Sequence, residues 1–438
     1  MSETRLTAVR GEIVHFLADP AHDTAALVHF NDGLLILTGG RIAECGPAQD
    51  LLPHLPSGTP VADYRGKLIL PGFIDTHVHY PQTDIIASHG EQLLEWLEKY
   101  TFPAERRFAE RAHADEVAGF FCDTLLRNGT TTACSFATVH ASSVDALFEA
   151  AQARRMRMIT GKVLMDRNCP DFLCDTAASG YAESKALIER WHDRDRLLYA
   201  ITPRFVPTST PEQLALAGQL FAEHPSVLLQ SHVAENRAEL EWVARLHPEA
   251  RSYLDVYAHH GLLGKRALYA HCIWLDDTDR QRMADTGTAI SFCPTSNLFL
   301  GSGLFDLARA RERGIRVGLG TDVGGGTSFS MLQTLNEAYK VLQLAGQSLS
   351  AVAAFHLATL GGARSLYLDD RIGNFAPGRE ADFVVLDPCA TPLLARRSAA
   401  CNTLEERLFT MMMLGDDRAV AATFVLGEAA WRRDTLPT

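Results

Sequence analysis

The chain has 438 residues, of which 47% are hydrophobic and 21% are charged, and its formal net charge is −12. This length and composition favour a globular protein with one large α/β domain and a smaller one. The negative charge and the lack of a basic stripe argue against nucleic acid as a partner, because phosphate binding requires clustered Lys and Arg.

The cysteines and the N-terminal segment bear on the compartment. Nine cysteines, an odd number without a C-x-x-C pair, favour a reducing environment over a disulfide framework. Residues 1–16 contain charged side chains and no continuous apolar core, so they do not resemble a secretory signal. No apolar run is long enough to span a membrane. We therefore expect a cytoplasmic protein that has no membrane partner.

The first 67 residues predict short strands and turns. The apolar runs Ala26–Phe30 and Leu34–Leu37 flank Asn31, Asp32 and Gly33, a pattern typical of a β-hairpin. We therefore expect residues 1–67 to form the N-terminal part of a small β domain.

From Leu68 onward, short apolar runs alternate with segments of helical periodicity. The eight apolar runs are Leu68–Ile74, Thr130–Ser135, Met158–Met165, Leu197–Ile201, Val227–His232, Ala267–His271, Ala289–Phe292 and Arg316–Gly320. Amphipathic stretches between them include Ala114–Asn128, Pro211–His224 and Asp276–Thr286. Eight buried strands that alternate with helices are what a (β/α)₈ TIM-like barrel requires. The number of strands does not by itself exclude an open doubly wound sheet.

The last part of the chain returns to strand-like patterns. Helical stretches at Ser330–Leu344 and Ser350–Leu360 are followed by the strand-like runs Ala381–Leu386 and Ala419–Leu426. We expect these runs to join the N-terminal segment in a small discontinuous β-sandwich. The predicted division is residues 1–67 for the N-terminal β part, 68–370 for the barrel and 371–438 for the C-terminal β part.

The strongest local motif is the run Pro71–His79, which closes the first predicted barrel strand. Alternate side chains of a strand share a face, so His77 and His79 point the same way. Two imidazoles on one face form half of a metal site. One or both could instead be buried histidines held by hydrogen bonds, but the His-x-His pattern with Asp75 two residues before it favours metal binding.

A second motif, Ser231–Glu235, closes the fifth predicted strand. His232 is a candidate third ligand, and Glu235 lies just beyond it. A carboxylate beside a metal-bound water is suited to act as a general acid and base. The alternative is a glutamate that the dipole of a following helix favours at its N-terminus.

Two further polar residues end predicted strands. Asp322 follows the glycine-rich eighth strand, and His271 ends the sixth. Taken singly, Asp322 also fits a helix N-cap, and His271 also fits a buried histidine held by a hydrogen bond. All these residues nevertheless fall at the carboxyl ends of strands one, five, six and eight, where barrels of this kind carry catalytic groups. The pattern therefore predicts metal-assisted hydrolysis without naming a substrate.

These motifs resemble those of the amidohydrolase superfamily across nearly the whole chain. The matching residues are PGFIDTHVH at 71–79, SHVAE at 231–235, His271, and GTD at 320–322. Within the superfamily the sequence is most similar to the guanine deaminase family. The runs that carry this closer likeness are Tyr80–Asp84, Ile201–Phe205, Phe292–Gly303 and Leu414–Arg418.

The resemblance implies one zinc ion per subunit and the hydrolysis of guanine to xanthine and ammonia by a zinc-activated hydroxide. The implied zinc ligands are His77, His79, His232 and Asp322. The implied catalytic residues are Glu235, which shuttles protons, His271, which orients the attacking hydroxide, and Asp322. The implied substrate contacts are His79, Gln82, Arg204, Phe205, His232, Glu235 and Asp322. A homodimer is also implied.

Several alternatives stay open from the sequence. Lys162 lies near the start of the third predicted strand and not at the end of the fourth, so one metal is favoured over a pair bridged by a carboxylated lysine. The pair His232 and Glu235 has the wrong spacing for the H-x-E motif of the cytidine-type zinc deaminases, and the C-x-x-C pair of their second motif is absent. A related amidohydrolase acting on a modified purine, a pterin or a triazine is the nearest rival. A non-catalytic scaffold should have lost ligands, and a metal-free binding protein would contain no zinc.

Overall fold

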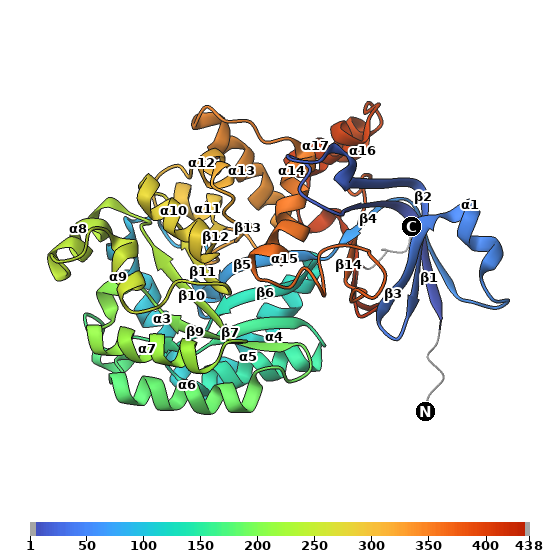
Figure 1. Ribbon diagram of the computed structural model, residues 1–438. Helices are drawn as coiled ribbons and strands as arrows, with labels where there is room; N and C mark the ends of the chain where they lie inside the picture. The colour runs from blue at the N-terminus through green and yellow to red at the C-terminus, as the bar shows by residue number, and fades with distance from the viewer. Residues whose placement is uncertain (1–5, 434–438) are drawn as a thin grey trace.

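The computed structural model describes residues 6–433, which form a parallel barrel and a separate mixed sheet (Figure 1). The barrel strands are β5 (Phe73–His79), β6 (Thr130–Phe136), β7 (Arg157–Gly161), β8 (Val163–Leu164), β9 (Leu197–Pro203), β10 (Leu228–Val233), β11 (Ala267–His271), β12 (Ala289–Phe292) and β13 (Val317–Leu319). Nearly all their residues are buried, as expected for parallel strands that are covered on both faces.

The strands follow the order β5-β6-β7-β9-β10-β11-β12-β13, with β8 paired to β9. Backbone hydrogen bonds then join the two ends of this path. Asp322 donates its N–H to the His77 carbonyl at 2.8 Å, and His79 donates to the Val323 carbonyl at 2.8 Å. These contacts close the barrel next to β5, so the predicted (β/α)₈ TIM-like barrel is confirmed and the open doubly wound sheet is excluded.

Helices cover the outside of the barrel (Figure 1). The longer ones are α4 (Arg111–Arg127), α5 (Ala141–Ala153), α6 (Ala177–Trp191), α7 (Pro211–Glu223), α8 (Arg237–Leu246), α10 (Asp277–Thr286), α13 (Met331–Leu344) and α17 (Leu404–Leu414). The shorter ones are α2 (Leu93–Trp96), α3 (Phe102–Arg106), α9 (Tyr253–His259), α11 (Pro294–Phe299), α12 (Leu307–Glu312), α14 (Ala351–His356), α15 (Gly362–Ser365) and α16 (Pro392–Ser398). The short helix α1 (Ala48–Leu51) instead packs against the mixed sheet. Within residues 6–433, no helix has both the length and the apolar character needed to cross a membrane.

Short helical turns connect these elements. The 3₁₀ turns are η1 (Thr24–Ala26), η2 (Leu52–His54), η3 (Tyr80–Ile85), η5 (Arg107–Ala109), η6 (Asp171–Leu173), η7 (Val206–Thr208) and η9 (Asp417–Ala419), and the π-helical turns are η4 (Leu97–Thr101) and η8 (Leu357–Gly361). The second π-helical turn continues α14, so the predicted helix at Ser350–Leu360 changes its hydrogen-bond pattern after His356.

The N- and C-terminal segments together form one seven-stranded sheet. Its order is β16 (Glu428–Arg432), β15 (Val420–Val425), β14 (Phe383–Leu386), β4 (Val61–Pro71), β1 (Thr7–Phe16), β2 (Leu27–Thr38) and β3 (Arg41–Pro47). Strands from both segments share an apolar cluster that includes Ile13, Leu35, Phe383 and Phe424. The discontinuous β domain is therefore confirmed, as a single hydrogen-bonded sheet. Residues 1–5 and 434–438 of this predicted domain lie outside the described residues, and the exact domain limits stay a prediction.

Two local predictions were wrong. The segment Asn31–Gly33 forms no hairpin, because β2 continues through it, with an irregularity in its pairing to β1, and turns into β3 only at Gly39 and Gly40. A Cβ on Gly33 would lie 2.7 Å from the Ile13 side chain, so this glycine allows a close approach of strands. The predicted first barrel strand Leu68–Ile74 is also divided, with its first part in β4 and its second part in β5.

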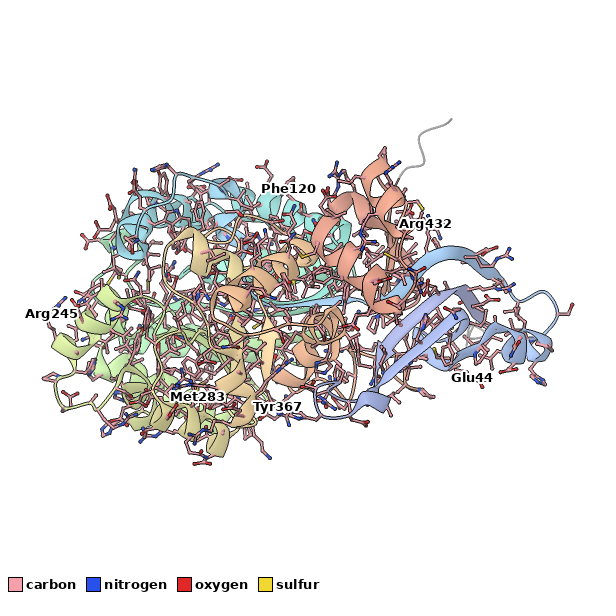
Figure 2. All side chains as sticks on the ribbon, turned by 90° about the horizontal axis from the view of Figure 1, so that it is seen from above. Glu44, Phe120, Arg245, Met283, Tyr367 and Arg432 are labelled. Carbon is pink, nitrogen blue, oxygen red and sulfur yellow. The ribbon has the colours of Figure 1, made fainter. Side chains whose placement is uncertain are left out.

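Viewed from above, the molecule is elongated, with Glu44 of β3 and Arg245 of α8 at opposite ends (Figure 2). The barrel interior is apolar at the amino ends of its strands. Residues such as Ile74, Ile159, Leu228 and Leu268 pack there against the segment 363–372. The carboxyl ends are therefore left for polar groups.

Buried ion pairs join the small domain to the barrel. Arg157 at the start of β7 and Arg196 just before β9 both donate to Glu380, Arg157 through Nε at 3.2 Å and Arg196 through Nη2 at 2.7 Å. Arg196 also donates to Asp382. All four side chains are 8% exposed or less. Burial raises the pKa of the Glu380 carboxyl, but the two guanidinium groups outweigh it and lower that pKa overall.

Replacing Glu380 should destabilise the protein strongly, because the variant E380Q leaves two buried arginines short of a counter-ion. We expect the free energy of unfolding to fall by about 3 kcal/mol, measured by urea denaturation. The control is E428Q, which removes an exposed partner of Arg155 and should cost about 0.5 kcal/mol or less. Equal losses in the two variants would contradict a structural role for the buried cluster.

Candidate active site

Polar side chains from several strands meet at the carboxyl end of the barrel. His77 and His79 lie on one face of β5, His232 lies on β10, and His271 ends β11. Asp322 follows β13, where the backbone contact with His77 brings it beside β5. The structure therefore brings together all the histidines and the aspartate that the sequence selected.

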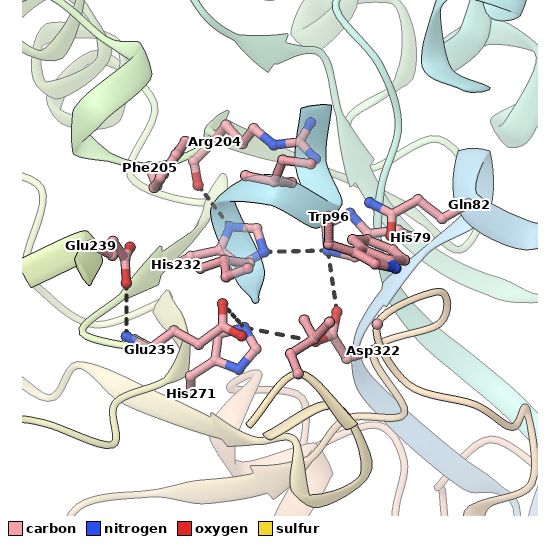
Figure 3. A pocket seen from close by; sticks show the side chains of 14 residues that line it. His79, Gln82, Trp96, Arg204, Phe205, His232, Glu235, Glu239, His271 and Asp322 are labelled. Carbon is pink, nitrogen blue, oxygen red and sulfur yellow. Dashed lines mark hydrogen bonds and ion pairs between the residues drawn. The ribbon is translucent and has the colours of Figure 1, made fainter. Parts of the chain in front are cut away.

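Four donor atoms converge within this group. His79 Nε2 lies 3.3 Å from His77 Nε2 and 3.2 Å from His232 Nε2. Asp322 Oδ1 lies 3.2 Å from His77 Nε2 and 3.3 Å from His79 Nε2. Figure 3 shows His79, His232 and Asp322 turned toward one another. Such a set of nitrogen and carboxylate donors can hold a metal ion.

Burial and charge set the protonation of these groups. Burial lowers the pKa of His79 to about 3 and that of His232 well below its ordinary value, so both rings stay neutral. Burial works against an ionised Asp322, but the adjacent His77 and His79 hold its pKa well below the usual range. Neutral imidazoles and a carboxylate are the protonation states that metal binding requires.

Hydrogen bonds orient two of the imidazoles. His232 Nδ1 lies 2.7 Å from the Arg204 carbonyl, so Nδ1 donates and the lone pair of Nε2 faces the cluster. His271 Nδ1 lies 2.9 Å from Asn297 Oδ1 and is oriented in the same way. Its Nε2 lies 3.3 Å from Glu235 Oε2 and 3.7 Å from Asp322 Oδ2. Both rings are therefore turned toward the cavity.

Asp75 ties β5 to the segment that follows β13. It accepts hydrogen bonds from the backbone N–H of His77 at 3.2 Å and of Thr321 at 3.0 Å, and another from the Thr321 hydroxyl. Burial raises the pKa of Asp75 to about 7, and the Thr321 bonds oppose this shift. The Asp75 carboxyl thus holds Thr321, the residue before Asp322, against β5.

The backbone around the site adopts strained conformations. Ala234, His271, Cys272 and Asp322 have φ values of 52°, 70°, 53° and 51°. Each costs about 1 kcal/mol or more for a residue with a Cβ. Surrounding contacts must hold these residues in place, as is common at functional sites.

Glu235 faces the cluster but lies apart from its metal-binding atoms. Its Oε1 accepts a hydrogen bond from the Ser302 hydroxyl at 3.0 Å, and its backbone N–H donates to Glu239 Oε2 at 3.0 Å. Burial raises the pKa of Glu235 to about 8, and the Asp322 charge adds to the shift. A carboxyl with a pKa near neutrality is suited to exchange protons.

A pocket opens above these groups. Its lining residues are His79, Gln82, Leu93, Trp96, Leu97, Arg204, Phe205, His232, Glu235, Glu239, His271, Leu300, Asp322 and Gly325. The mixture of apolar side chains with a few polar groups is typical of a site for a small molecule.

All seven residues that the resemblance implies as substrate contacts line this pocket, among them Gln82, Arg204 and Phe205. Arg204 follows β9 and is 3% exposed, and Gln82 accepts a hydrogen bond from the Gly324 N–H at 3.2 Å. Phe205 packs edge-on against Trp242, with ring centroids 6.1 Å apart. Phe205 therefore belongs both to the pocket and to an apolar cluster beside it.

Some residues around the site were missed in the sequence. Glu239 lines the pocket and caps the start of α8, together with Asn236. The spacing N-x-x-E is a capping-box signal that could have pointed to it. Glu105, which binds Arg204, is fully buried, and no local pattern distinguishes it. Arg204, which it contacts in space, lies 99 residues away in the chain.

Two features of the sequence lie away from the pocket. Lys162 is buried between β7 and β8, where its Nζ contacts Asp175 and the Val139 carbonyl, so it is engaged elsewhere. In the Leu414–Arg418 run, Arg418 is exposed and pairs with Asp416. Neither feature lines the pocket.

Comparisons with known proteins agree with this geometry. A model of the amidohydrolase family matches residues 68–430. The guanine deaminase of Escherichia coli (strain K12) is 54% identical over 435 residues, 99% of either chain. The solved structure of E. coli guanine deaminase has a TM-score of 0.96 and covers 98% of this chain and 100% of its own. The structure of guanine deaminase from C. acetobutylicum with bound guanine in the active site has a TM-score of 0.88 at 30% identity, and covers 97% and 100% of the two chains.

The family model spans most of the chain, and the E. coli relative matches nearly all of it at high identity. The strand-end histidines and the aspartate lie where such a barrel carries its catalytic groups. The chain belongs to the amidohydrolase family, in the group that these guanine deaminases form.

Proposed function

We propose that the protein catalyses the hydrolysis of guanine to xanthine and ammonia. The observation that carries this proposal is a buried cluster of four donors, with Glu235 beside it, at the base of a pocket whose wall includes Arg204, Gln82 and Phe205. The guanine deaminases described above support the same substrate, since one of their structures holds guanine in its active site.

The donor set fits a single zinc ion held by His77, His79, His232 and Asp322. Ligands about 2.0–2.1 Å from a tetrahedral zinc lie about 3.3 Å from one another. The measured separations of 3.2–3.3 Å between donor atoms match this spacing. A zinc ion bound there would lower the pKa of a coordinated water and supply a nucleophile near neutral pH.

The polar wall of the pocket suits the edge of guanine that does not react. Arg204 offers rigid N–H donors to the carbonyl oxygen at C6. The Gln82 amide can pair with the neighbouring ring N–H, and the Phe205 ring can pack against the purine face. These contacts turn the amino-bearing carbon C2 toward Glu235 and His271.

Glu235 moves the protons in this proposal. It takes a proton from the attacking water and passes it to a ring nitrogen next to C2, while the water oxygen bonds to C2. His271 Nε2 faces the space between Glu235 and Asp322 and orients the water. The hydroxyl now on C2 then gives up its proton, which reaches the amino group. The C2–N bond breaks as the C2 carbonyl forms, and ammonia and xanthine are released.

Guanine turnover is the direct test of the proposed activity. The purified protein should convert guanine to xanthine, lose this activity after dialysis against a chelator, and regain it with Zn²⁺. Elemental analysis should find one zinc per chain. Modified purines, pterins and triazines should react more slowly. Faster turnover of one of these compounds, or no dependence on metal, would contradict the assignment.

Replacing Glu235 separates proton transfer from binding. The variant E235Q keeps the shape of the side chain but cannot take up a proton, so kcat should fall about 10²–10⁴-fold. Zinc content and purine affinity should stay near those of the parent protein. The matched control is E241Q, an exposed glutamate on α8, which should react at the parent rate. A near-normal kcat for E235Q would rule out its role.

The family resemblance also leads us to propose a homodimer. Sedimentation at micromolar concentration should show a species of about twice the chain mass of 48.1 kDa. A single monomeric species under those conditions would contradict it.

A further inference from the structure

Arg204 is held by a helix from a distant part of the chain. Both oxygens of Glu105 on α3 accept hydrogen bonds from Arg204 Nη1, at 2.9 and 2.8 Å. The Phe102 ring on the same helix lies 5.6 Å from the guanidinium carbon. Residues three apart share a helix face, so one face of α3 supplies both an anion and an aromatic ring to the guanidinium.

The rest of the guanidinium stays available for a ligand. Within residues 6–433, no side chain or carbonyl accepts a hydrogen bond from Arg204 Nε or Nη2. Arg204 lines the pocket, and Figure 3 shows its side chain at the pocket wall above His232. Binding of Nη1 by Glu105 therefore leaves two rigid donors for a ligand that carries an acceptor.

Glu105 also balances the charge of Arg204. Glu105 is 0% exposed and Arg204 is 3% exposed, so water screens neither charge effectively. Burial raises the pKa of Glu105 above its ordinary value overall, and the hydrogen-bonded Arg204 guanidinium opposes this shift. The pair presents hydrogen-bond donors to the pocket without a net charge.

We propose that Glu105 is a positioning residue that orients Arg204 and cancels its charge, so that the pocket favours a neutral purine with a carbonyl group over an ionised purine. This inference rests on the proposed function. Guanine is neutral near pH 7, whereas xanthine is a stronger acid because its second carbonyl spreads the charge of the anion. An arginine without its counter-ion would retain that anion, so Glu105 limits inhibition by the product.

The experiment measures xanthine affinity by calorimetry below and above the pKa of xanthine, which requires no turnover. The variant E105Q keeps an acceptor oxygen and removes the charge. E105Q should bind xanthine more tightly than the parent protein does. This gain in affinity should be about tenfold larger above the pKa of xanthine than below it. In steady-state assays at the higher pH, the ratio of the xanthine Ki to the guanine KM should fall by a similar factor.

Three further variants control the result. E105D keeps the charge and should restore the parent pH dependence. R204Q leaves Glu105 without its partner and should shift the pH dependence in the opposite direction, which keeps the test valid even where E105Q fails to fold. E98Q changes an exposed glutamate on the neighbouring turn η4 and should match the parent protein.

The parent protein and E105Q share the other titratable groups of the pocket, so the titration of these groups cancels when the xanthine affinities of the two proteins are divided at each pH. These groups are His79, His232, Glu235, Glu239, His271 and Asp322. An unchanged pH dependence in both E105Q and R204Q would overturn the inference while guanine turnover by the parent protein stood. A parent protein that neither turns over guanine nor binds xanthine would instead refute the proposed function.

Discussion

The closure of the barrel between β5 and β13 is the contact on which the site depends. Asp322 binds the His77 carbonyl through its backbone, and Thr321 binds Asp75 through both its backbone and its hydroxyl. These bonds bring the last strand beside the first, although 243 residues separate Asp322 from His79 in the sequence. Without this closure the carboxylate would be missing from the imidazole cluster, and the positive φ at Asp322 would have no neighbours to hold it.

At this buried end of the barrel, the pKa values of two nearby carboxyl groups shift in opposite directions. Imidazole neighbours hold the pKa of Asp322 well below its ordinary range, whereas burial and the Asp322 charge raise that of Glu235 to about 8. The first carboxyl therefore stays charged, as its proposed role as a ligand requires, and the second is suited to exchange protons. Glu239 and Ser302 fix the second carboxyl in place through its backbone and side chain.

Buried ion pairs connect the barrel to other parts of the molecule at two places, one at the pocket and one away from it. The segment from α2 to α3 lies at the pocket, where Trp96 and Leu97 line it and Glu105 binds Arg204. The Glu380 ion pairs lie at the amino ends of β7 and β9, where they join these strands to the segment before β14. The ion pair at the pocket and the ion pairs that join the two domains thus lie at opposite ends of the barrel strands.

The alternation of apolar runs and amphipathic segments was enough to predict the barrel, and the His-x-His run with His232, His271 and Asp322 was enough to predict a metal site. Both signals are local, since strand periodicity and short motifs depend on neighbouring residues. The division between β4 and β5 and the continuation of β2 past Gly33 depend on the packing of distant segments at Gly72 and Gly33. Glu105 and the pKa shifts of Asp322 and Glu235 likewise depend on burial and on partners far away in the chain, which only the tertiary structure brings into contact.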